Sequence, residues 1–131
     1  MTSATRITAL AFGLGIALFG APVLAQGKEP AMTGKTAMGP VLTDAKGMTL
    51  YVFDKDTAGK STCNGPCAAN WPPLMADSSA KPMGKYTVVT RDDGSRQWAY
   101  NGKPLYTWAK DAKAGDTTGD GVNSVWHVAK P

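Results

Sequence analysis

Two stretches of the chain decide its fold: GMTLYVFDKD at residues 47–56 and GKPLYTWAKD at residues 102–111. They align without a gap at a constant offset of 55 residues, and at the same offset Trp71 corresponds to Trp126. Each copy reads Gly-x-x-Leu-Tyr-x-aromatic-x-Lys-Asp, followed by a tryptophan. Because two copies are too few for a solenoid, the sequence predicts one pseudo-symmetric domain.

The repeated segments favour β-strands, since they are short, rich in aromatic residues and bounded by turn residues. Asn101-Gly102 predicts a tight primed turn because both positions accept a positive φ. The only helical signal is the short run Cys67–Asn70, which Pro72 and Pro73 end. We therefore expect a mostly β fold: a small single antiparallel β domain with two pseudo-repeats and at most one or two short helical turns. Further strands are expected at 86–90, 96–100 and 125–128.

The N-terminus has the pattern of a secretory signal. Arg6 precedes a run of about fifteen mostly apolar residues, and small or apolar residues end at Ala25, which predicts a Sec-type signal cleaved near Ala25. The run is short for a membrane span, and no lipobox cysteine follows, so we expect a periplasmic or secreted protein without a transmembrane segment. The expected organisation is a signal peptide at 1–25, a disordered tether at 26–40 and a two-repeat β domain at 41–131.

Charge excludes one class of partner. Without Arg6 the chain carries 13 basic and 10 acidic side chains, interspersed along the sequence. This balance is not a nucleic-acid footprint. The oligomeric state does not follow from these features, and the expected partner is an unidentified envelope ligand or protein.

The motifs together resemble a family of secreted repeats and predicted lipoproteins marked by a Tyr-x-aromatic-x-x-Asp motif. The resemblance covers nearly the whole expected mature domain and implies export and a shared fold. Since the family is described chiefly as having no known function, it implies no particular chemistry. The residues that carry the resemblance are Tyr51-x-Phe53-x-x-Asp56, Tyr106-x-Trp108-x-x-Asp111, Cys63 and Cys67, Trp71 to Leu74, Asp92 to Gly102, and Trp126-His127-Val128.

The repeated motif has two interpretations. Aromatic faces stack on flat ligands, and a nearby carboxylate fixes a hydroxyl or a cation, which favours a binding site. Alternatively, the period of two places both aromatic side chains of each strand on one face, which is typical of a core, with the aspartates bonding to the following turn. The candidate residues are Tyr51, Phe53, Asp56, Trp71, Tyr106, Trp108, Asp111 and Trp126.

Cys63 and Cys67 allow three hypotheses. In an oxidising compartment a structural disulfide is favoured, although it closes a loop of only five residues. Two thiolates also suit a soft metal such as copper, with His127 or a methionine completing the site. A thiol-redox pair is the third hypothesis, although three intervening residues depart from the familiar spacing of two.

The sequence offers no acid–base pair that would support catalysis, because His127 is the only histidine and no serine has a nucleophile-elbow context. We therefore expect a non-enzymatic envelope module that binds a ligand or partner and needs no cofactor. The alternative is a soft-metal (copper) or thiol-redox protein that uses Cys63 and Cys67.

Overall fold

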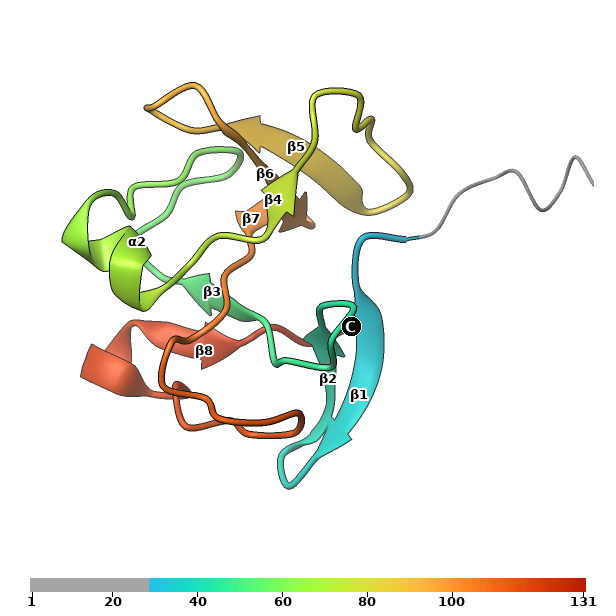
Figure 1. Cartoon of the computed structure of the whole chain (residues 1–131), viewed down its shortest axis with the longest axis vertical. Coiled ribbons are helices and arrows are strands. Elements are labelled where there is room, and N and C mark those ends of the chain that lie inside the picture. The colour runs from blue at the N-terminus through green and yellow to red at the C-terminus, as the bar shows by residue number, and fades with distance from the viewer. Residues whose placement is uncertain (1–28) are drawn as a thin grey trace, which may run out of the picture.

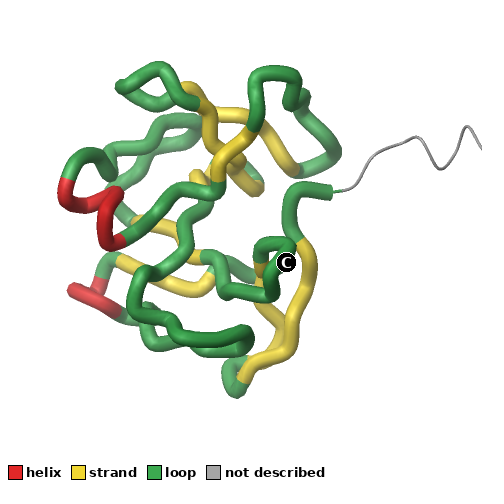
Figure 2. Tube along the Cα trace, viewed as in Figure 1, coloured by secondary structure: helices red, strands yellow, loops and turns green. Residues whose placement is uncertain are grey.

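The structure, a computed structural model, describes residues 29–131. The expected signal peptide at 1–25 and the first residues of the expected tether lie outside this range. Antiparallel strands and turns dominate the described part, as Figure 2 shows, so the predicted fold class is confirmed. The elements are β1 (Met32–Thr36), β2 (Gly39–Thr43), β3 (Tyr51–Phe53), α2 (Pro66–Asn70), β4 (Met75–Ala76), β5 (Tyr86–Thr90), β6 (Arg96–Tyr100), β7 (Lys103–Pro104), the 3₁₀ helix η1 (Val122–Ser124) and β8 (Trp126–Val128).

Each repeat begins with a β-hairpin. In the first repeat β1 pairs with β2, and in the second β5 pairs with β6 (Figure 1). Met32 lies opposite Thr43 in the first hairpin, and Thr87 lies opposite Ala99 in the second. These hairpins therefore occupy equivalent places, and the structural repeat is longer than the motif that reveals it.

The expectation of a disordered tether at 26–40 is wrong for the described residues, because β1 lies within it. The composition of this segment is polar and rich in glycine and proline, and most β1 side chains are exposed. Its order comes instead from backbone pairing with β2 across the turn at 37–38, and Gly39, which follows this turn, has a φ of 89°. The strand β2 in turn buries Val41 and Leu42 in the core.

The two repeats meet at Tyr51 and Tyr106. The backbone N–H of each tyrosine donates to the carbonyl of the other, at 2.7 and 3.0 Å. On its other side Tyr51 pairs with Val128 of β8, and Tyr106 pairs with Pro73. Since Val128 and Pro73 are themselves 55 positions apart, a pseudo-twofold axis passes between the tyrosines.

An Asn-Gly pair forms the turn between β6 and β7. Asn101 and Gly102 have φ values of 51° and 81°, so both central residues are left-handed, as the Asn-Gly pair predicts. The turn brings Lys103 opposite Tyr100. It also leads directly into the second copy of the motif.

Two clusters of buried side chains form the core. The first surrounds the pseudo-twofold axis, and the second lies under the hairpins. The first cluster contains Val41, Tyr51, Cys63, Trp71, Tyr106, Trp126 and Val128, and the second contains Ala31, Leu42, Leu50, Tyr86, Leu105 and Ala129.

Candidate functional site

The two motif tyrosines exchange hydrogen bonds between the repeats. Tyr51 donates to Oδ2 of Asp111 at 2.6 Å, and Tyr106 donates to Oδ2 of Asp56 at 2.6 Å. The tyrosine of each repeat therefore bonds to the aspartate of the other. Both tyrosine side chains are fully buried, which makes these charge-assisted bonds structurally important.

The second oxygen of each aspartate closes a local turn. Oδ1 of Asp56 accepts bonds from the N–H and hydroxyl of Thr62, and Oδ1 of Asp111 accepts the same pair from Thr118. Both carboxylates are thus used within the fold. This agrees with the prediction that the aspartates bond to the following turn, and adds a long-range bond that the sequence did not indicate.

Burial raises the pKa of Tyr51 and Tyr106 well above the ordinary tyrosine value, and hydrogen bonding to Asp111 and Asp56 raises each further. Ionising either hydroxyl would place a second negative charge beside a carboxylate in the interior. Both tyrosines are therefore hydrogen-bond donors at physiological pH.

The motif aromatics form one continuous stack across both repeats. Trp71 and Trp126 lie at the centre, with ring centroids 3.7 Å apart and planes inclined by 4°. Phe53 stacks on Trp126 at 4.1 Å, and Trp108 stacks on Trp71 at 3.9 Å. The order Phe53–Trp126–Trp71–Trp108 alternates between the repeats and obeys the same pseudo-twofold axis.

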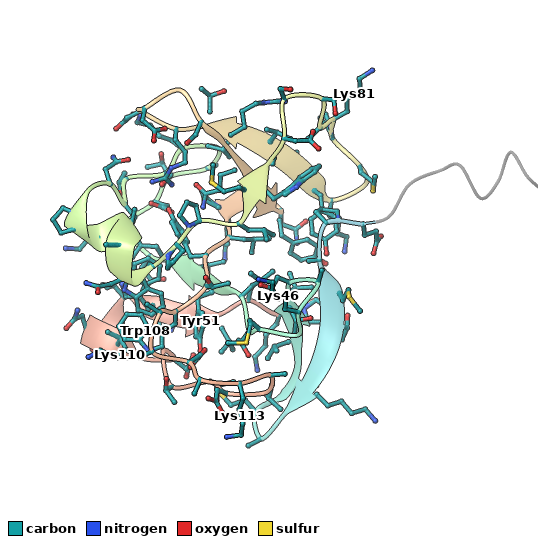
Figure 3. The ribbon with its side chains drawn as sticks, viewed as in Figure 1. Lys46, Tyr51, Lys81, Trp108, Lys110 and Lys113 are labelled. Atoms are coloured by element: carbon teal, nitrogen blue, oxygen red, sulfur yellow. A yellow bond between two sulfur atoms is a disulfide. The ribbon has the colours of Figure 1, made fainter. Side chains whose placement is uncertain are left out.

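The tyrosines brace this stack from the side. Tyr51 meets Trp71 edge to face, with an interplanar angle of 78°, and Tyr106 meets Trp126 at 89°. The structure thus brings all eight predicted motif residues together, chiefly as core. Figure 3 shows Tyr51 inside the fold, with Trp108 and Lys110 next to each other nearer the surface. Only the end rings, Phe53 and Trp108, remain half-buried.

Cys63 and Cys67 are joined in a disulfide, with an S–S distance of 2.03 Å. A buried guanidinium holds the loop that carries them: Arg91 donates to the carbonyl of Cys63 at 2.6 Å and to the hydroxyl of Ser61 at 2.9 Å. Ser61 in turn contacts the hydroxyl of Tyr106 at 2.6 Å. The disulfide is therefore tied to the motif through a chain of hydrogen bonds that the sequence analysis did not identify.

His127 lies apart from this chain. Its Nε2 is 2.8 Å from Oδ2 of Asp54, and both side chains are about half exposed. Residues 29–131 contain no group of three or more histidine, cysteine, aspartate or glutamate side chains that could hold a metal ion. The set formed by Cys63, Cys67 and His127 is therefore not assembled as a metal site in this structure.

A cleft of about 400 Å³ opens between α2 and η1, beside the aromatic stack. These two helices come from equivalent places in the repeats and lie on the same side of the molecule (Figure 1). Both repeats line the cleft, so it lies near the pseudo-twofold axis. Its lining residues are Phe53, Lys55, Cys67, Asn70, Trp71, Asn123, Val125 and Trp126.

The polar part of this lining was not predicted from the sequence. Lys55, Asn70 and Asn123 are exposed and present an ammonium and two amides above the aromatic edges. Asn123 and Ser124 have φ values of 52° and 62°, which non-glycine residues rarely adopt. Such backbone conformations cluster at binding sites. The local sequence gives no signal that predicts them.

The fold and the interlocked motif define a class: a domain of two β repeats that exchange tyrosine–aspartate bonds around a shared aromatic stack. The family model described as a secreted repeat of unknown function matches residues 32–75 and 87–130. The chain belongs to this family, as the sequence motifs predicted. No curated protein and no solved structure matches it. Within residues 29–131, no helix is long and apolar enough to cross a membrane.

Proposed function

We propose that this protein is an exported, non-enzymatic binding module that holds a small acidic saccharide in the cleft between α2 and η1. One observation carries the proposal: exposed polar groups of both repeats converge above the edge of the aromatic stack. Most of the motif forms the core, because Tyr51, Tyr106, Trp71 and Trp126 are buried. The candidate binding site is therefore the cleft beside the aromatic stack, which the motif residues form.

The chemistry of the lining suits a hydroxylated anion. Indole and phenyl edges contact the apolar face of a sugar ring, while Asn70 and Asn123 exchange hydrogen bonds with hydroxyls. Lys55 supplies one positive charge for a carboxylate. The volume of about 400 Å³ matches one or two sugar units rather than a long polymer.

The absence of an acid–base pair in the lining supports binding without catalysis. Lys55 is the only free titratable side chain among the described residues of the cleft, since Cys67 is in the disulfide. Asp56 and Asp111 are already fully hydrogen-bonded within the fold. Export is supported by the expected signal peptide and by the family's description as a secreted repeat.

The test is a titration of the mature protein with N-acetylmuramic acid, in which tryptophan fluorescence is the readout. Trp71 and Trp126 line the cleft, so an occupant is expected to change their emission. N-acetylglucosamine, which lacks the carboxylate, is expected to bind more weakly. If neither sugar changes the fluorescence at millimolar concentration, the result contradicts the proposal.

Two variants localise the binding. Lys55→Gln removes the charge, and Asn123→Gly removes the amide while keeping a residue that accepts a positive φ. Both are expected to weaken binding without lowering stability. Lys110→Gln is the matched control, because Lys110 is equivalent to Lys55 but lies over Trp108, 5.9 Å from its ring centroid. Equal effects of Lys55→Gln and Lys110→Gln would place the ligand elsewhere.

A further inference from the structure

One loop of the molecule occurs in both repeats, and only the first copy carries a disulfide. In the first repeat this loop is 63–70 and contains Cys63 and Cys67, whereas in the second it is 119–125 and contains no cysteine. Each copy begins after a threonine that bonds the motif aspartate and ends before a tryptophan of the aromatic stack. The second copy therefore shows how this loop closes without a disulfide.

The loop of the second repeat forms its helical turn through backbone hydrogen bonds. The N–H groups of Val122, Ser124 and Val125 donate to carbonyls three positions earlier, at 3.2, 3.0 and 3.1 Å. Gly121 donates in addition to the carbonyl of Trp126 at 2.7 Å. The turn thus closes in this architecture without a covalent link, so the link in the first repeat adds a property beyond closure of the turn.

The two cysteines differ in their access to solvent. Cys63 is fully buried, and Arg91 holds its carbonyl at 2.6 Å. Cys67 is only half-buried and lines the cleft between α2 and η1. A thiolate exchanges with a disulfide only where it can reach one of the two sulfur atoms. Cys67 is therefore the residue whose sulfur an external thiolate can attack.

Few contacts besides the disulfide hold the first turn of α2. None of the residues of this helix is buried, and its N-terminus has no side-chain cap. Figure 1 shows α2 at the edge of the molecule with loops on both sides. A helix of five residues is not stable on its own in water. Cleavage of the disulfide is therefore expected to release the turn at Cys67, while the carbonyl of Asn70 keeps its 2.9 Å bond from the N–H of Ala109.

We propose that the Cys63–Cys67 disulfide is redox-active and that a dithiol reductant cleaves it by attack on Cys67. One thiolate of the reductant attacks Sγ of Cys67, the S–S bond breaks, and Cys63 leaves as a thiolate. The second thiol of the reductant then displaces Cys67 and closes the reductant's own disulfide. Each cysteine thiolate takes up a proton, so two electrons and two protons pass to the protein.

Reduction also affects the cleft, because Cys67 forms part of its lining. A wall that is mobile must be ordered when a ligand binds, which lowers the affinity. The reduced protein is therefore expected to bind N-acetylmuramic acid about fivefold more weakly than the oxidised protein. This consequence rests on the function proposed above, whereas cleavage of the disulfide and release of α2 do not.

Reduced glutathione, a monothiol, locates the attack. The folded mature protein is incubated with an excess of glutathione at mildly alkaline pH, quenched with acid, digested and analysed by mass spectrometry. The expected product carries glutathione on Cys67 and a free thiol at Cys63. Glutathione found mainly on Cys63, or a disulfide that reacts only after denaturant is added, would overturn the proposal.

Hydrogen exchange detected by mass spectrometry measures the release of α2. Dithiothreitol is expected to speed exchange of residues 64–70 about tenfold or more, and to change residues 119–125 less than about twofold. The circular dichroism spectrum is expected to remain that of the folded protein. The matched control is the double variant Cys63→Ala with Cys67→Ala, which should exchange at the faster rate with or without dithiothreitol.

The outcomes separate this proposal from the proposed function. Unchanged exchange of residues 64–70 after reduction, or unfolding of the whole domain, would overturn the redox proposal. Absence of N-acetylmuramic acid binding to the oxidised protein would contradict only the proposed function, because the exchange measurement needs no ligand. Equal affinities of the oxidised and reduced proteins would overturn the effect of reduction on the cleft.

Discussion

The hydroxyl of Tyr51 donates a 2.6 Å hydrogen bond to Asp111, a residue of the other repeat. The reciprocal bond from Tyr106 to Asp56 has the same length. Each repeat therefore completes the hydrogen bonding of its partner in the interior. Replacing Tyr51 or Tyr106 by phenylalanine is expected to lower the free energy of unfolding by about 1.5–3 kcal/mol, because each change leaves a carboxylate oxygen without its donor.

Urea denaturation followed by circular dichroism measures this effect. Tyr100→Phe is the matched control, since Tyr100 is only half-buried and lies outside the Tyr–Asp exchange. Its free energy of unfolding is expected to stay within about 0.5 kcal/mol of the parent protein. Equal losses for Tyr51→Phe and Tyr100→Phe would show that the exchanged bonds contribute little.

Alkaline pH is expected to destabilise the protein. The pKa of Tyr51 and Tyr106 is raised in the folded state, so the unfolded state loses these protons first, from its ordinary pKa of 10.0. Stability from this source is complete below pH 10 and declines above it, by about 1.4 kcal/mol per pH unit for each tyrosine. Absorbance at 295 nm during a pH titration should show Tyr51 and Tyr106 ionising only as circular dichroism reports unfolding. Ionisation of all four tyrosines in a native spectrum would contradict this.

A compensating size difference distinguishes the two ends of the stack. A Cβ on Gly119 would lie 2.8 Å from Cη2 of Trp71 and 2.9 Å from Cγ of Trp108. The equivalent position in the first repeat is Cys63, because Cys63 follows Thr62 as Gly119 follows Thr118, and both threonines bond to their motif aspartates. The ring at that end of the stack is Phe53, which is smaller than Trp108. Gly119→Ala is therefore expected to cost about 1–3 kcal/mol of stability. Trp108→Phe should recover part of this loss.

The measurement is the free energy of unfolding of Gly119→Ala in the parent and in the Trp108→Phe background. A smaller loss in the second background supports the compensation. Identical losses would mean that the indole of Trp108 does not set the space available to Gly119.

The disulfide is expected to contribute modestly to stability. Closing a loop of five residues constrains the unfolded chain by about 2 kcal/mol in the loop-entropy model. The variant with both cysteines changed to alanine should lose about this amount, together with the packing of the buried Cys63 sulfur. Urea denaturation measures this loss. A loss below about 0.5 kcal/mol would show that the disulfide constrains the unfolded chain little.

Much of the fold followed from the sequence because its signals are local. The Asn101-Gly102 turn and the strand at Tyr86–Thr90 each depend on neighbouring residues, and the two copies of the motif can be read directly from the sequence. The strand β1 was missed because its order comes from backbone pairing with β2 rather than from its own apolar side chains. Composition is a poor guide when the partner strand supplies the core.

The candidate site was predicted only in part, since its geometry is long-range. The eight motif residues do come together, but the sequence could not show that Tyr51 bonds Asp111 rather than Asp56, or that the rings alternate between repeats. Asn70 and Asn123 gave no signal, because their place in the cleft depends on how α2 and η1 meet. Pairing across a pseudo-twofold axis is a property of the assembled fold.

A double-mutant cycle on Tyr51 and Asp111 tests the interlocking of the repeats most directly. It compares the free energies of unfolding of Tyr51→Phe, Asp111→Asn and the double variant, with a parallel cycle on Tyr51 and Asp56. We predict a coupling of about 1–2 kcal/mol for Tyr51 with Asp111, and less than about 0.5 kcal/mol for Tyr51 with Asp56. Strong coupling within one repeat, and none between the repeats, would contradict it.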